Sequence, residues 1–181
     1  MSLVLPAMAS TRTPLSAWRP GSVLWSDTRT IQLGGRGGRF PVEWTDFSEG
    51  REFHSESGWQ LDWDPNNLET PALAGLRLYL NSASKRMVSA VEGGTVSSDS
   101  DLMRYMHYDV ARVLVTGALG NSDFGTEVYP DESVGQTLGR LIRALFPDEE
   151  IPQVRQRMTD RPSRFDSELQ GRLRLLREST P

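Results

Sequence analysis

The sequence predicts an α+β fold, in which a small aromatic-rich antiparallel sheet in the N-terminal third packs on a helical C-terminal part. All five tryptophans of the 181 residues lie within the first 63 positions, among stretches where apolar and polar residues alternate. From Thr70 onward, apolar residues recur at three- and four-residue steps. Alternation is the period of a half-buried strand, and the longer step is that of a helix. We therefore expect two differently built parts that share one core.

Residues 1–14 are expected to form a tail, and residues 15–181 a single domain with a β-rich part (15–68) and a helical part (70–181). A chain of this length can bury a core without disulfides or metals. A sheet this small is not stable alone, so its tryptophan-bearing face should pack on a long helix that begins at Pro71.

Four strands are expected in the β-rich part, over residues 22–25, 29–33 and 40–44 and within 51–63. Pro41 predicts an edge position for the third strand, because proline lacks the N–H that a ladder needs. In the fourth strand, Trp59, Leu61 and Trp63 should share one face, since they recur at period two.

Four or five helices are expected after residue 70. Thr70 and Pro71 are a typical helix start, and helical spacing then continues until Gly93. A Ser/Asp linker over 97–101 leads into a second helix that ends at Gly117 or Gly120. A third helix is expected to begin near Asp131 or Ser133 and to end at Pro147. Two shorter helices are expected over residues 152–159 and 163–177.

Composition excludes several classes of chemistry. The chain has no cysteine, which excludes disulfides, thiolate zinc sites and cysteine nucleophiles and fits a cytoplasmic location. The net charge of −4 creates no overall attraction for nucleic acid. No apolar stretch approaches the ~20 residues needed to span a membrane. We expect no cofactor: residues 113–120 resemble the opening of a dinucleotide-binding fold, but helical spacing upstream favours a helix that ends at glycine.

Two further motifs have a structural and a functional interpretation. Residues 62–67 begin like a calcium loop, with Asp62, Asp64 and Asn66 at alternate positions, but Asn67 and Leu73 stand where glycine and glutamate are needed. A strand-to-helix turn is favoured, and ion binding is left open. His107 lies in the second expected helix and is interpreted as a partly buried structural histidine, with Tyr105, Tyr108 and Asp109 as its nearest hydrogen-bonding neighbours.

Arginine dominates the candidate binding residues. The six residues from Gly34 to Arg39 alternate glycine pairs with arginine, which favours a hairpin loop but also suits a phosphate contact. Residues 151–177 carry seven arginines against three acidic residues. The predicted binding residues are Arg36, Arg39, Arg172, Arg174 and Arg177.

The favoured function is a non-enzymatic binding or assembly subunit whose partners are other protein subunits, a second copy included, in a complex such as a phage particle, secretion machine or defence system. Arg172, Arg174 and Arg177 are expected to bind carboxylates of a neighbour, so alanine at all three should weaken binding with little change in melting temperature. One alternative is nucleic-acid binding through Arg36, Arg39 and the C-terminal arginines. The other is a hydrolase that uses His54 with carboxylates drawn from Glu43, Asp46, Glu49, Glu52, Glu56, Asp62 and Asp64.

Overall fold

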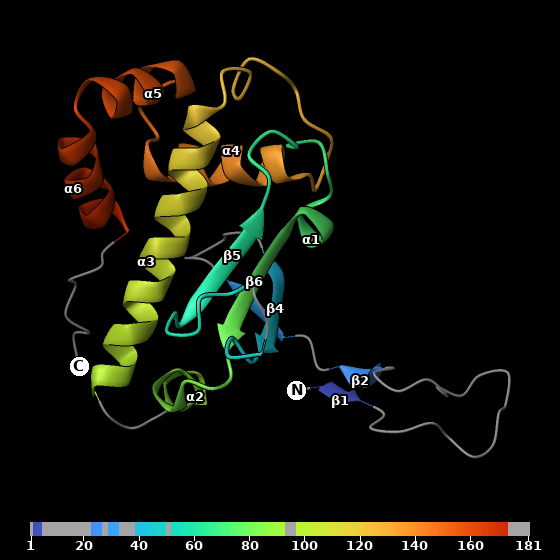
Figure 1. Cartoon of the computed structure of the whole chain (residues 1–181). Coiled ribbons are helices and arrows are strands. Elements are labelled where there is room, and N and C mark those ends of the chain that lie inside the picture. The colour runs from blue at the N-terminus through green and yellow to red at the C-terminus, as the bar shows by residue number, and fades with distance from the viewer. Residues whose placement is uncertain are drawn as a thin grey trace, which may run out of the picture.

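The computed structural model describes residues 2–4, 23–26, 29–32, 39–49, 52–92 and 97–173, and it has the predicted α+β architecture (Figure 1). Side chains are described for residues 41–49, 52–92 and 101–173. The strands lie in the N-terminal half and the long helices in the C-terminal half. The expected glycine-rich loop that contains Arg36 lies outside the described residues, as do Arg174 and Arg177.

The main sheet is mixed, whereas the sequence predicted an antiparallel one. Its four strands lie in the order β3 (Arg29–Gln32), β4 (Arg39–Thr45), β6 (Leu76–Asn81) and β5 (Trp59–Trp63). The β4 and β6 strands are parallel, and the other two pairings are antiparallel. A separate antiparallel pair joins β1 (Ser2–Val4) to β2 (Val23–Ser26).

The long helix predicted from Pro71 is wrong. This segment holds the four-residue helix α1 (Ala72–Gly75), the strand β6 and the helix α2 (Lys85–Val91). Leu76 and Leu80 lie four residues apart, which fits a helix, but Leu78 between them also satisfies strand alternation. All three leucines are at most 1% exposed in the middle of the sheet. Residues 76–81 therefore form a strand, because the strand buries these leucines on one face and pairs with a neighbour on each edge.

The edge position predicted for the strand that contains Pro41 is also wrong. The β4 strand lies between β3 and β6. Proline is tolerated here because the parallel ladder with β6 begins one residue later, where Val42 pairs with Leu78.

The remaining predicted helices are confirmed. They are α3 (Ser97–Gly120), α4 (Val134–Leu145), α5 (Ile151–Asp160) and α6 (Pro162–Arg172). The expected linker over residues 97–101 is instead the start of α3. The Ser133 hydroxyl caps α4, because it accepts a hydrogen bond from the N–H of Gln136 at 3.2 Å. Among the described helices, none combines the length and the apolar character that crossing a membrane requires.

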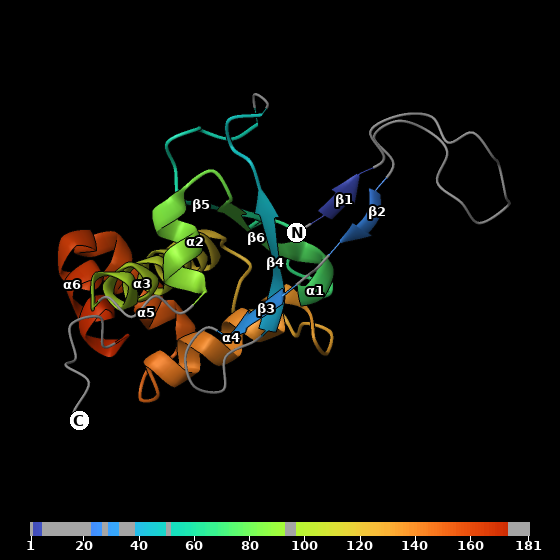
Figure 2. The ribbon, with the colours of Figure 1, turned by 90° about the horizontal axis from the view of Figure 1, so that it is seen from below.

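The tryptophan-bearing face of β5 packs on α3, and not on a helix that begins at Pro71. Trp59 donates its indole N–H to Oδ2 of Asp109 at 3.0 Å. The ring of Trp63 lies over Gly117, so close that a β-carbon on this glycine would fall 2.4 Å from Cζ2 of the ring. Seen from below (Figure 2), α3 lies between the sheet and the pair α5 and α6, so it forms the centre of the core.

Candidate functional site

The structure describes the side chain of one predicted binding residue, Arg172. Arg39 begins β4, but its side chain lies outside the described part of the molecule. Arg172 ends α6 and donates from Nε to Oε1 of Glu168 at 2.9 Å, and its Nη2 forms an ion pair with the same oxygen at 2.7 Å. A further N–H donates to the carbonyl of Leu145, and the guanidinium carbon lies 4.5 Å from the ring centroid of Phe146. Arg172 thus makes contacts within its own chain, and alanine there would remove intramolecular stabilisation as well as any binding contact.

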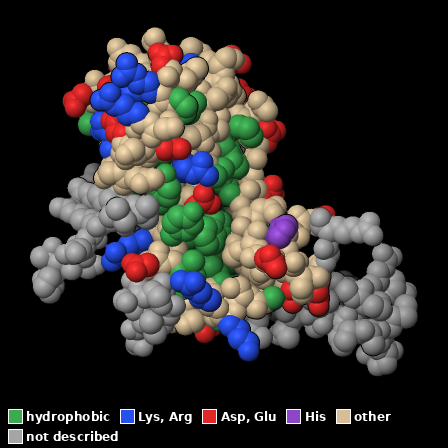
Figure 3. All heavy atoms as spheres, turned by 60° about the vertical axis from the view of Figure 1, so that its left-hand side comes forward, with side chains coloured by type: hydrophobic (Ala, Val, Ile, Leu, Met, Phe, Trp, Pro, Cys, Tyr) green, Lys and Arg blue, Asp and Glu red, His purple; other side chains and the backbone are tan. Residues whose placement is uncertain are grey.

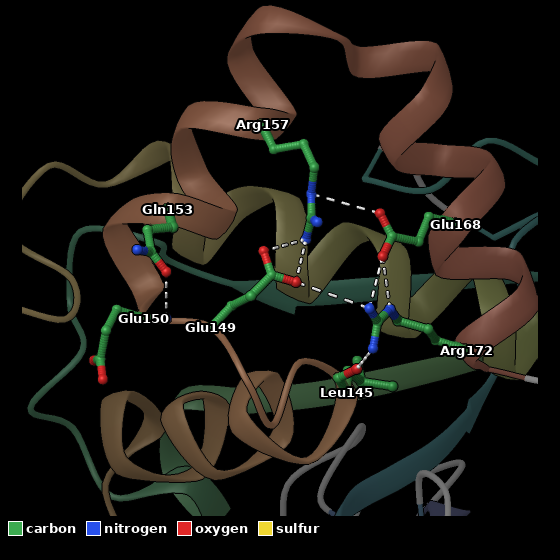
Figure 4. A network of polar contacts seen from close by, with 7 residues as sticks. All are labelled: Leu145, Glu149, Glu150, Gln153, Arg157, Glu168 and Arg172. Carbon is green, nitrogen blue, oxygen red and sulfur yellow. Dashed lines mark hydrogen bonds and ion pairs between the residues drawn. The ribbon is translucent and has the colours of Figure 1, made fainter.

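Arg172 belongs to a network of two arginines and two glutamates that joins the turn after α4 to α5 and α6 (Figure 4). Nη2 of Arg157 lies 2.9 Å from Oε2 of Glu149, and Nε of Arg157 lies 3.5 Å from Oε2 of Glu168. This Nε is buried and makes an ion pair but no hydrogen bond. Among the described arginines of this end, Arg157 and Arg172 therefore pair with these two glutamates.

A surface hollow of about 760 Å³ lies between α5 and α6. Arg157 and Glu168 of the network form one side of it. Arg161 and Arg164 are exposed, and neither makes an ion pair or side-chain hydrogen bond with another described residue. The complete lining is Gln153, Gln156, Arg157, Asp160, Arg161, Arg164, Ser167 and Glu168.

Local sequence places Arg161 at the corner between the two helices. The residue before a proline is disfavoured in helical backbone, and Pro162 follows directly. Arg161 has φ −143° and ψ 65°, so it ends α5 and also precedes the first residue of α6. Arg164 lies in the first turn of α6. In the sequence, both arginines belong to the basic end and neither was predicted as a binding residue. The signal that could have distinguished them is the Arg161-Pro162 break between two helical patterns.

Phe146 and Phe165 form the apolar support beneath this site. Both side chains are 1% exposed, and their rings stack with centroids 5.8 Å apart. The guanidinium carbon of Arg157 lies 5.3 Å from the Phe146 ring centroid. Phe146 follows α4 and Phe165 lies in α6, so the stacking joins the end of α4 to one of the two helices that line the hollow.

A second, smaller hollow of about 240 Å³ lies beside α4 and is mostly apolar. The ring of Tyr129 covers Gly135 on its floor. One acidic residue, Glu127, and one basic residue, Arg143, line it, so it offers no uncompensated charge.

Of the proposed hydrolase residues, Glu43 and Asp46 interact with other side chains of the described structure. Glu43 pairs with Arg77 at 3.6 Å, and the Asp46 carboxylate accepts from the hydroxyl and the N–H of Ser48, which lower its pKa. His54 is exposed in a loop, not in the strand that was expected. Neither hollow has any of the seven carboxylates or His54 in its lining.

Residues 62–67 contain the end of β5 and then an ordinary turn from Asp64 to Asn67, as the favoured interpretation predicted. The Asp64 carboxylate accepts from the N–H of Asn66 at 2.8 Å, and its carbonyl accepts from the N–H of Asn67 at 3.1 Å. Within the described residues, no three His, Asp or Glu side chains are grouped so that they could hold a metal ion.

His107 is partly buried, as predicted, but its expected partner is engaged elsewhere. Asp109 accepts from Trp59 and from Arg112, the latter at 3.2 Å. Nε2 of His107 is buried without a hydrogen-bond partner in the described structure. Burial disfavours the charged imidazolium and lowers the pKa of His107.

Comparison with protein-family models gives no match to this chain, and comparisons with curated proteins and with solved structures give none either.

Proposed function

We propose that this chain is a non-enzymatic binding subunit that holds acidic segments of a protein partner in the hollow between α5 and α6. The observation that carries the proposal is the pair of exposed arginines, Arg161 and Arg164, that line the hollow without a partner among the described residues. A guanidinium presents a planar fork of donors that suits a carboxylate. Two such forks three residues apart can receive two acidic side chains of one segment.

The charge distribution favours a peptide over a nucleic acid. Asp160 and Glu168 share the lining with three arginines, so the hollow has a balance of only one positive charge. A phosphate backbone is bound by a continuous row of basic residues that neutralises several phosphates.

The rigidity of the site supports the same proposal. The ion pair of Arg157 with Glu168 joins α5 to α6, and the stacked phenylalanines join α6 to the end of α4. A preformed site loses less conformational entropy on binding than a flexible one. We also propose that the chain acts as an assembly subunit. A cytoplasmic location, which fits the absence of cysteine, is part of the same proposal.

Binding of a fluorescently labelled, glutamate-rich peptide, followed by anisotropy at low salt, tests the proposal. We expect the double variant R161A/R164A to raise the Kd about tenfold, because partly exposed arginine–carboxylate pairs contribute up to ~1 kcal/mol each. The matched control is R86A/R140A, which removes two exposed arginines outside the hollow. An equal loss in the control, or no loss in R161A/R164A, contradicts the proposal. Displacement of the peptide by a single-stranded oligonucleotide at lower concentration would favour the nucleic-acid alternative.

A further inference from the structure

The loop between β4 and β5 is acidic and largely exposed. Residues 46–56 carry Asp46, Glu49, Glu52 and Glu56 against one basic residue, Arg51. The three glutamates are exposed, and their side chains make no ion pair or hydrogen bond with any residue in the described ranges. The loop thus has uncompensated carboxylates, as the hollow between α5 and α6 has uncompensated arginines.

Aromatic and polar contacts hold this loop in a defined position. Phe47 is 1% exposed and stacks on Phe53 with centroids 4.5 Å apart, and Phe53 meets the ring of Tyr79 at 5.1 Å. The buried side chain of Asn81 donates to the carbonyls of Ser55 and Ser57 at 3.1 and 2.8 Å. The carboxylates consequently project from a fixed surface, which lowers the entropy lost when they bind.

The loop and the hollow lie too far apart to meet within one molecule. In Figure 1, α5 and α6 lie at the upper left, whereas the loop before β5 lies at the lower end of the sheet near α2. Figure 2 agrees, because the loop extends to the top of that view and α6 lies at its left. In the space-filling view (Figure 3), Lys and Arg side chains gather near the upper end beside several Asp and Glu side chains, and further side chains of both signs lie lower down, beyond a hydrophobic area.

We infer that the hollow of one copy of this chain receives the acidic β4–β5 loop of a second copy. The inference rests on the proposed function and names its partner. Complementary charge carries it: Arg161 and Arg164 face outward from one end of the molecule, and Glu49, Glu52 and Glu56 face outward from another. Because the two surfaces differ, the contact is heterologous, and repetition of it produces a ring or an open chain of copies.

A mixing experiment with two variants, each of which replaces the charged side chains of one surface with uncharged ones, tests the inference. R161A/R164A removes the arginines of the hollow but keeps the acidic loop, and E49Q/E52Q/E56Q does the reverse. All five positions are exposed, so both variants should fold, which circular dichroism checks. By sedimentation velocity at low salt, the unmodified chain should form larger species as its concentration rises, and each variant alone should need about a tenfold higher concentration to do so.

An equimolar mixture of the two variants should form a one-to-one dimer that does not grow, because only one intact hollow and one intact loop can meet. Added salt should dissociate it, since exposed charges are screened beyond about 10 Å at 0.1 M. A strictly monomeric unmodified chain, a mixture without dimer, or a variant that assembles like the unmodified chain would overturn the inference. If the glutamate-rich peptide still binds in a manner that needs Arg161 and Arg164, the proposed function stands and only the second copy is the wrong partner.

Discussion

Replacing Gly117 with alanine is the most direct perturbation of the contact between sheet and helix. Gly117 lies in α3 beneath Trp63 of β5, and an added β-carbon would fall 2.4 Å from Cζ2 and 2.9 Å from Cη2 of the indole. Real β-carbons do not approach other heavy atoms this closely, so the rigid ring would have to move. The substitution therefore changes two terms of opposite sign.

The first term favours alanine, because glycine inside a helix costs about 1 kcal/mol relative to alanine. The second opposes it, because an extra methyl group in a packed contact costs about 1–3 kcal/mol. We expect the clash to dominate and the free energy of unfolding to fall by about 1 kcal/mol. At a urea dependence of about 2 kcal/mol per molar, the midpoint should drop by about 0.5 M.

Urea unfolding of G117A, W63F and the double variant measures both terms. Phenylalanine lacks the benzo ring of tryptophan, so G117A should become stabilising by up to about 1 kcal/mol in the W63F background, and the sign change isolates the contact. G120A is the matched control, since nothing lies within 4 Å of a β-carbon at that end of α3. If G117A stabilises the unmodified chain as much as it does W63F, the packing of Trp63 on α3 is refuted.

Two further predictions concern buried polar groups. N81A should lower the free energy of unfolding by about 3 kcal/mol in urea, because Asn81 donates to the carbonyls of Ser55 and Ser57 and accepts from the N–H groups of Phe47 and Ala83; a loss below ~1 kcal/mol would contradict this. For His107, whose pKa is lowered by burial, the unfolded chain binds a proton more readily than the folded one, so stability should be complete above pH ~6.5 and fall as the pH drops below it. H107Q should lack that component of the pH dependence, and parallel stability curves for both proteins between pH 5 and 8 would disprove it.

The sequence by itself determined the features that depend on neighbouring residues. Ser133 marks the start of α4 and Pro162 the break between α5 and α6, because caps and prolines act on backbone within one helical turn. Continuous helical spacing fixed α3, and alternation of Trp59, Leu61 and Trp63 fixed β5. These signals are local, so they can be read without knowing the fold.

Part of the candidate site was accessible from the same signals. The excess of arginine after residue 151 pointed to the end of the chain that contains the hollow between α5 and α6. It could not separate Arg172, which pairs with Glu168 in its own helix, from Arg161 and Arg164, which line the hollow. That separation depends on which carboxylates lie nearby, and Glu149 reaches the network from a turn outside both helices.

Only the tertiary structure decided the segment after Pro71. Leu76, Leu78 and Leu80 satisfy the period of a helix in part and that of a strand in full, so local pattern leaves the choice open. The parallel partner β4 begins 37 residues earlier at Arg39, and the antiparallel partner β5 begins at Trp59. A strand here buries three leucines and pairs its backbone on both sides, whereas a helix would leave the edges of β4 and β5 unpaired. The free energy of these distant contacts exceeds the local helix preference, and for that reason the central strand of the sheet was the element that the sequence did not reveal.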